Sequence, residues 1–141
     1  MKLILGSSSK YRKNILKKAG YVFDILVPDI DEKLIQTNDP YKKPLLVARA
    51  KADALVAKIK EPALLITSDV VVVCNGEARE KPQSEDEARE FLREYGKGVG
   101  LEGVTAIVVY NTVTKKYYEG IDKAQVFFSE FPEFVIEDFI K

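Results

Sequence analysis

The sequence predicts an α/β fold built on a mixed central sheet with flanking helices. Apolar, strand-like segments alternate with segments of helical periodicity along the 141 residues. One segment, ALLITSDVVVVC at 63–74, is so rich in β-branched residues that we expect a central strand. The chain length and a hydrophobic content of 46% predict one domain over residues 1–141.

Capping residues and prolines set the bounds of the elements in the first half of the chain. Ser8 or Ser9 can cap a helix that Gly20 ends, and Pro28 stops the strand that follows. Pro44 suits the first turn of a second helix. The expected elements are a strand at 2–5, a helix up to Gly20, a strand at 21–27 and a helix from Pro44 to about Lys60.

Turn residues divide the second half in the same way. Polar residues at 68–69 suggest a break within the strand at 63–74, and NGE at 75–77 is typical of a tight hairpin. Ser84 begins a helix that Gly96 ends. The remaining expected elements are a hairpin arm at 78–81, strands at 104–111 and 123–130 joined around residues 112–120, and a last helix from Pro132.

Composition and charge disfavour several classes of function. The 22 acidic and 22 basic residues cancel, so the overall field draws the chain neither to a nucleic acid polymer nor to an anionic membrane. No apolar stretch approaches the roughly 20 residues of a membrane span. With no histidine and a single cysteine, Cys74, zinc ligation and histidine-based catalysis are disfavoured, and a cytoplasmic location is predicted. The chemistry must then use carboxylates, lysine, arginine and hydroxyls, with or without a hard metal ion.

Asp69 is the most unusual candidate because it interrupts an apolar run, where a carboxylate needs a partner or a cleft. It is interpreted as a general base or metal ligand, or as a turn aspartate between two shorter strands. Three carboxylates at 29–32 suit either a magnesium ion held through substrate phosphates or a solvated loop. Lys51 and Lys81 can likewise serve the same cleft or lie on the surface.

The opening segment LILGSSSKYR is the candidate phosphate site. A helix N-terminus presents unpaired N–H groups and a positive dipole end, and the hydroxyls of Ser7, Ser8 and Ser9 with the guanidinium of Arg12 would strengthen anion binding. The spacing of a P-loop is absent. The alternative is a serine cap followed by a solvated basic helix face.

Five segments in register resemble the Maf family, the septum-formation-inhibitor-like nucleoside triphosphate pyrophosphatases. They are LILGSSSKYR, PDIDEK, ARAKADAL, SDVVVV and EAREKPQSEDEAREF, and the REKP form resembles the plant-like eukaryotic branch. The resemblance implies an elongated sheet with a cleft between two lobes. It implies hydrolysis of pyrimidine or modified nucleoside triphosphates to monophosphate and pyrophosphate. It also implies a divalent cofactor, Mg²⁺ or Mn²⁺.

The same resemblance implies roles for individual residues. Asp69 would be the catalytic acid–base residue and would share the metal with Glu32. The residues expected to bind the substrate are Ser7, Ser8, Ser9, Arg12, Lys51 and Lys81.

Three further expectations concern the end of the chain and the alternatives. Family members continue beyond the position of Lys141 with a segment that contributes to the base pocket, so the chain is expected to be C-terminally short. One alternative is a weakly active or inactive homologue that binds a nucleotide or a protein as a regulatory module, with the last helix covered by a partner or in a homodimer. Action on inosine-type purine nucleotides is a second alternative, by analogy with a related cleft fold.

Overall fold

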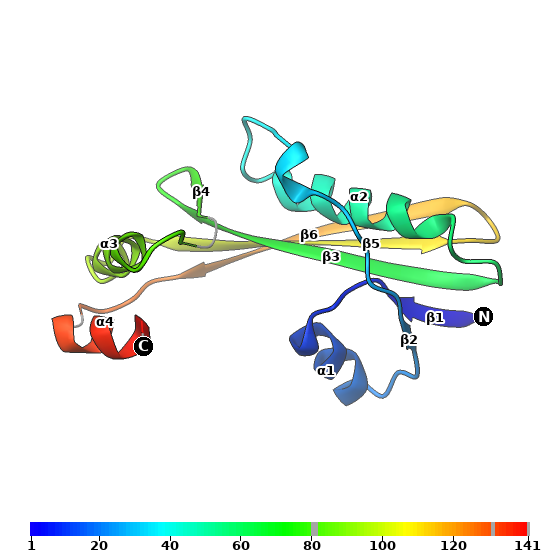
Figure 1. Ribbon diagram of the computed structural model, residues 1–141, viewed down its shortest axis with the longest axis horizontal. Helices are drawn as coiled ribbons and strands as arrows, with labels where there is room; N and C mark the ends of the chain where they lie inside the picture. Colours follow the sequence, from blue (N-terminus) through cyan, green and yellow to red (C-terminus); the bar gives the residue numbers. More distant parts are fainter. Residues whose placement is uncertain (80–81, 131, 141) are drawn as a thin grey trace.

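The computed structural model describes residues 1–79, 82–130 and 132–140. Its strands are β1 (Lys2–Leu5), β2 (Asp24–Ile25), β3 (Ala63–Cys74), β4 (Glu77–Arg79), β5 (Leu101–Asn111) and β6 (Lys116–Val126). They form one sheet in the order β2-β1-β3-β5-β6, with β4 paired to β3. β1 is parallel to β2 and β3, whereas β5 is antiparallel to β3 and β6. The predicted mixed, elongated α/β sheet is therefore confirmed (Figure 1).

The helices cover both faces of this sheet and one of its ends. They are α1 (Lys10–Lys18), α2 (Lys43–Val56), α3 (Glu85–Tyr95) and α4 (Glu133–Ile140), with a short 3-10 turn at Glu32–Leu34. α2 packs on β3 and β5, and α1 lies on the opposite side of the sheet (Figure 1). The core lies beneath α2, where Ala52 and Leu55 meet Leu65 and Val108. None of the helices within the described ranges has both the length and the apolar character to cross a bilayer.

Local capping signals placed most helix ends correctly. The Ser9 hydroxyl accepts a hydrogen bond from the N–H of Arg12, and the Ser84 hydroxyl accepts one from the N–H of Glu87. Gly20, with φ of 88°, closes α1. α2 ends at Val56, four residues before the expected Lys60.

The expected break in β3 is absent. Ser68 and Asp69 pair with Ile107 and Ala106 of β5 in an uninterrupted antiparallel register. Because this pairing satisfies the backbone and Lys51 of α2 contacts the Asp69 carboxylate, the strand accommodates the acid without a turn. The interpretation of Asp69 as a turn residue was therefore wrong.

The predictions for β2 and β6 were also wrong in extent. Only Asp24–Ile25 of the expected strand at 21–27 pair with β1, because the N–H of Tyr21 still donates to the last turn of α1. The segment expected to link the last two strands is mostly strand itself. The Asn111 side chain accepts hydrogen bonds from the next residues, so the turn is short and Lys116 already lies opposite Asn111. As an exposed edge strand, β6 lacks the apolar pattern of a buried one.

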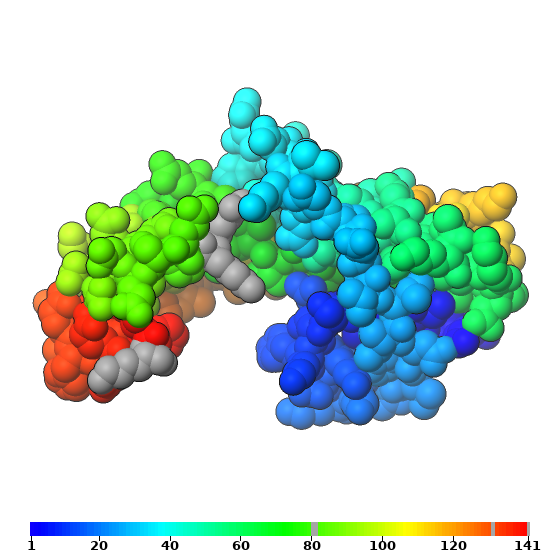
Figure 2. All heavy atoms as spheres, viewed as in Figure 1, coloured from blue at the N-terminus to red at the C-terminus, as the bar shows by residue number. Residues whose placement is uncertain are grey.

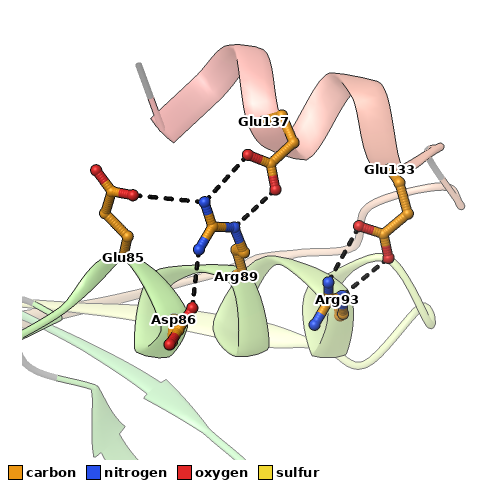
Figure 3. Close-up of polar contacts among 6 residues, drawn as sticks. All are labelled: Glu85, Asp86, Arg89, Arg93, Glu133 and Glu137. Atoms are coloured by element: carbon orange, nitrogen blue, oxygen red, sulfur yellow. Dashed lines mark hydrogen bonds and ion pairs between the residues drawn. The ribbon is translucent and has the colours of Figure 1, made fainter.

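Two arginine–glutamate pairs hold α4 against α3 (Figure 3). Arg89 donates from Nε and Nη2 to the Glu137 carboxylate at 2.7 and 3.1 Å. Arg93 donates in the same way to Glu133 at 2.8 and 3.2 Å. Since Ile136 is the one α4 residue that the structure shows as buried, the docking of α4 depends largely on charge.

We therefore expect the docking of α4 to weaken with salt and with loss of these carboxylates. In the double variant Glu133→Gln, Glu137→Gln, amide hydrogen exchange in residues 133–140 should accelerate several-fold at low salt, and 1 M NaCl should reduce the difference from the parent. Asp138→Asn is the matched control, because this α4 residue makes no ion pair with the described part of the chain. Equal exchange rates in parent and double variant would contradict the charge-based docking.

Candidate active site

Serine hydroxyls organise the turn between β1 and α1. The Ser7 hydroxyl is buried and accepts hydrogen bonds from the N–H of Ser9 at 3.1 Å and from Nη1 of Arg12 at 3.4 Å. Ser9 caps the helix, whereas Ser8 is exposed and its hydroxyl has no partner among the described residues. The interpretation as a serine cap is therefore confirmed for Ser9. The interpretation as a phosphate site stays a prediction, for which Ser8 offers a hydroxyl beside the helix N-terminus.

Gly6 lets this turn pass close to the core. A Cβ built on Gly6 would lie 2.7 Å from Cδ1 of Leu55 and 2.8 Å from Cγ2 of Thr67. We expect Gly6→Ala to lower the free energy of unfolding by about 1–3 kcal/mol, because both contacts are shorter than packed side chains allow. Chemical denaturation measures the change, with Gly120→Ala on exposed β6 as control, where a Cβ meets nothing. An unchanged unfolding free energy would show that Leu55 repacks without cost.

Lys51 lies between two carboxylates. Its Nζ is 3.3 Å from Oδ1 of Asp69 and 3.3 Å from Oε1 of Glu32, and it donates to the carbonyl of Ser68. The side chains of Lys51 and Asp69 are only 12% and 14% exposed, whereas that of Glu32 is 54% exposed. The ammonium therefore joins the acidic loop to the central strand.

A buried hydrogen bond places Lys51 opposite Asp69. The Thr67 hydroxyl donates to the carbonyl of Ala48 at 2.7 Å and so ties β3 to α2. Ala48 precedes Lys51 by one helical turn on α2, and Thr67 precedes Asp69 by two residues on the same face of β3. The buried core beneath α2 thus fixes the geometry of the exposed cleft.

The surroundings of Asp69 make it a stronger base than a solvated aspartate. Burial raises its pKa above the ordinary value, and the Glu32 carboxylate acts in the same direction. The cations of Lys51 and Arg12 oppose these effects and lower the pKa of Asp69. A raised pKa means a higher affinity of the carboxylate for a proton, which is what a general base requires.

Two adjoining cavities form the cleft. The smaller, of about 180 Å³, is lined by Ser7, Ser8, Ser9, Arg12, Glu32 and Lys51, with Pro28 and Ile30. The larger, of about 690 Å³, shares Glu32 with it and contains Asp69. In the space-filling view the molecule is hollowed between the part that carries α1 and the part that carries α3 and α4 (Figure 2).

The residues of this cleft fit a hard divalent ion that arrives with phosphate. No group of three or more His, Cys, Asp or Glu side chains within the described residues could hold a metal alone. Glu32 and Asp69 supply two carboxylates on either side of one ammonium. Mg²⁺ is commonly held by one or two carboxylates together with substrate phosphates and water, so this donor set suits Mg²⁺ or Mn²⁺.

Most of the predicted site residues lie around one cleft. It brings together Ser7, Ser8, Ser9, Arg12, Glu32, Lys51 and Asp69. Lys81 falls outside the described residues. Sequence reasoning missed Arg79 and Gln83, which also line the larger cavity. They flank Lys81 in the segment REKPQ, but a lone arginine in a hairpin has no pattern that separates it from a surface residue.

Comparison with solved structures gives the fold class of the protein. The fold is similar to that of a nucleoside-triphosphatase, or dITP/XTP pyrophosphatase, from Mycobacterium abscessus. The TM-score is 0.52 at 10% identity, covering 94% of this chain and 76% of that one. The likeness establishes the α/β fold predicted from sequence. Together with a cleft lined by hydroxyls, cations and carboxylates, it defines an α/β protein with a strongly polar cleft beside its sheet.

Within that class, the chain belongs to the Maf-like protein family, whose model matches residues 2–141. It is 43% identical over 146 residues to a 7-methyl-GTP pyrophosphatase of Dictyostelium discoideum, covering 99% of this chain and 74% of the relative. It is 30% identical over 138 residues to a dTTP/UTP pyrophosphatase of Vibrio vulnificus, covering 98% of this chain and 73% of the relative. The family resemblance seen in the five sequence motifs is confirmed.

Proposed function

We propose that the protein hydrolyses nucleoside triphosphates to the monophosphate and pyrophosphate with a divalent metal. The observation that carries the proposal is the convergence of Asp69, Lys51 and Glu32 beside the serine turn. The names of its relatives, 7-methyl-GTP pyrophosphatase and dTTP/UTP pyrophosphatase, support the same reaction.

The residues divide between phosphate binding and proton transfer. The β- and γ-phosphates would lie at the N-terminus of α1, bound by the Ser8 hydroxyl and by Arg12. A water molecule attacks the α-phosphorus in line. Its oxygen forms the new P–O bond as the bond to the bridging α–β oxygen breaks, and Asp69 accepts the proton. Pyrophosphate is the leaving group.

Lys51 and the metal neutralise charge around that attack. Lys51 stabilises the ionised form of Asp69 before the reaction and can bind a phosphate oxygen when substrate enters. Glu32 and Asp69 would hold the divalent ion, which offsets the negative charge of the triphosphate. Lys81 is proposed as a further phosphate ligand on the family resemblance alone.

The base specificity is proposed from the relatives. Pyrimidine and modified nucleotides both remain candidates, since the named substrates of the relatives are dTTP and UTP in one case and 7-methyl-GTP in the other. All three bases carry a ring carbonyl at the position where cytosine or adenine has an amino group.

A nucleotide panel tests the reaction. The protein is incubated with 7-methyl-GTP, GTP, dTTP, UTP, CTP, ITP and ATP in Mg²⁺, Mn²⁺ or EDTA, and the products are separated by anion exchange. Pyrophosphate and monophosphate in equal amounts, formed only with metal, are expected. Release of orthophosphate and a nucleoside diphosphate, or no product from any nucleotide, would refute the proposal.

A second candidate is a nucleotide- or protein-binding regulatory module, which one feature of α4 favours. Its Phe134 and Phe139 side chains are 68% and 78% exposed, a cost that a homodimer or a protein partner would remove. Light scattering coupled to size exclusion tests the dimer. A stable monomer that turns over the panel at ordinary enzymatic rates would argue against this candidate.

A further inference from the structure

The cleft that holds Asp69 continues into an apolar groove along α3. This groove has a volume of about 630 Å³ and shares four residues with the larger cavity of the cleft: Val72, Arg79, Pro82 and Gln83. Its far side includes the rings of Phe91 and Tyr95. A ligand with its phosphates at the serine turn can therefore extend from a polar surface onto an apolar one, as the two halves of a nucleotide require.

Arg79 stands where the two cavities meet. Its Nη2 donates to Oε2 of Glu94 at 2.8 Å, and its guanidinium carbon lies 4.9 Å from the centre of the Phe91 ring. The side chain is only 16% exposed. An ion pair on one side and an aromatic face on the other fix the orientation of the planar guanidinium.

This guanidinium retains hydrogen-bond donors that the described part of the chain does not use. Of its five N–H groups, one is taken by Glu94, and the buried Nε has no acceptor among the described residues. The thiol of Cys74 is a further polar group beside it, and sulfur is a weak acceptor. Because the Nε is itself buried, a ligand oxygen in the groove would accept from the unused N–H groups of the terminal nitrogens, for which it is a stronger acceptor than the thiol.

We propose that Arg79 selects the base by donating a hydrogen bond to a ring carbonyl, so that the preferred substrates are 6-oxopurine and 4-oxopyrimidine nucleotides. The inference rests on the proposed function for its substrate. Adenine and cytosine would direct an amino group toward the guanidinium, which places donor against donor. Because Glu94 neutralises Arg79, a cationic ring such as 7-methylguanine is also accepted.

Two pairs of nucleotides test the effect of the ring carbonyl on binding. UTP and CTP differ at C4, and ITP and ATP differ at C6, with carbonyl in the first of each pair and amine in the second. Dissociation constants are measured by calorimetry in an Asp69→Asn background, so that the readout does not depend on turnover. We expect UTP and ITP to bind at least about tenfold more tightly than CTP and ATP.

The variant Arg79→Met should bring both ratios close to one, while the affinity for inorganic tripolyphosphate stays unchanged. Arg49→Met is the matched control, since Arg49 is also paired with a glutamate, Glu119, and lies over an aromatic ring, that of Tyr117, but lines neither the cleft nor the groove. If Arg79→Met does not fold, Glu94→Gln replaces it. The uncompensated cation should then weaken binding of 7-methyl-GTP relative to GTP and leave the UTP to CTP ratio in favour of UTP.

The outcomes separate this inference from the proposed function. The role of Arg79 is overturned if the affinity ratios of UTP to CTP and of ITP to ATP are near one in the Asp69→Asn background. It is also overturned if adding Arg79→Met leaves these ratios unchanged, even if the enzyme hydrolyses nucleotides. A preference for UTP and ITP that Arg79→Met abolishes supports the role of Arg79 even if the nucleotide panel shows no turnover. Absence of turnover would refute only the proposed hydrolysis.

Discussion

Replacing Asp69 by asparagine is expected to lower kcat for nucleotide hydrolysis by about 10²- to 10⁴-fold, the range that a lost general base produces. The amide preserves the size of the side chain and an oxygen for Lys51, which lies 3.3 Å away. It cannot accept a proton from the attacking water, and it carries no charge for a metal. The rate of pyrophosphate release at saturating nucleotide and metal measures the effect.

Stability separates a chemical defect from a structural one in this variant. Since burial disfavours the charged form of Asp69, removing the charge should leave the thermal midpoint close to that of the parent. Asp53→Asn is the control, because Asp53 lies on α2 and binds Tyr117 on the side away from the cleft. An Asp69→Asn variant with parental kcat would exclude Asp69 as the base.

The elements that sequence predicted well are those with local causes. A hydroxyl at Ser9 or Ser84 binds a backbone N–H three residues later, and Asn75 and Gly76 adopt positive φ in a tight turn, whatever the remaining chain does. The extent of β6 has no local cause. It depends on pairing with β5 in register from Asn111 onward, and its exposed residues carry no apolar alternation.

The residues of the candidate site show the same difference between local and tertiary causes. A helix lysine such as Lys51 has no distinguishing pattern, and only the family resemblance indicated it. Its position opposite Asp69 follows from tertiary packing, through the hydrogen bond between Thr67 and the Ala48 carbonyl. Neither a local sequence pattern nor the family resemblance indicated Arg79. Its place at the junction of two cavities depends on the contact between the β4 hairpin and α3.

Replacing Lys51 by methionine should impair both binding and proton transfer. Methionine fills a similar volume but removes a cation that contacts Asp69 and Glu32. If Lys51 also binds a phosphate oxygen, as proposed above, KM should rise about 10- to 100-fold, the usual effect of losing a charge-assisted hydrogen bond. Lys58→Met, just beyond the end of α2, is the control for loss of a lysine outside the cleft. Steady-state kinetics with metal in excess measures the effect on binding as KM and the effect on proton transfer as kcat.

The pH dependence of Lys51→Met gives the sharper result, because it reports on the base itself. Burial raises the pKa of Asp69, and Lys51 holds it down, so removing the ammonium allows this pKa to rise further. Asp69 accepts a proton only when it is ionised, and activity therefore increases as the pH rises through its pKa. The acid limb of the pH–kcat profile should move to higher pH in Lys51→Met and return toward the parental position in Lys51→Arg, which restores the positive charge. A change in KM with an unmoved acid limb would make Lys51 a phosphate ligand alone and would separate it from the proton transfer at Asp69.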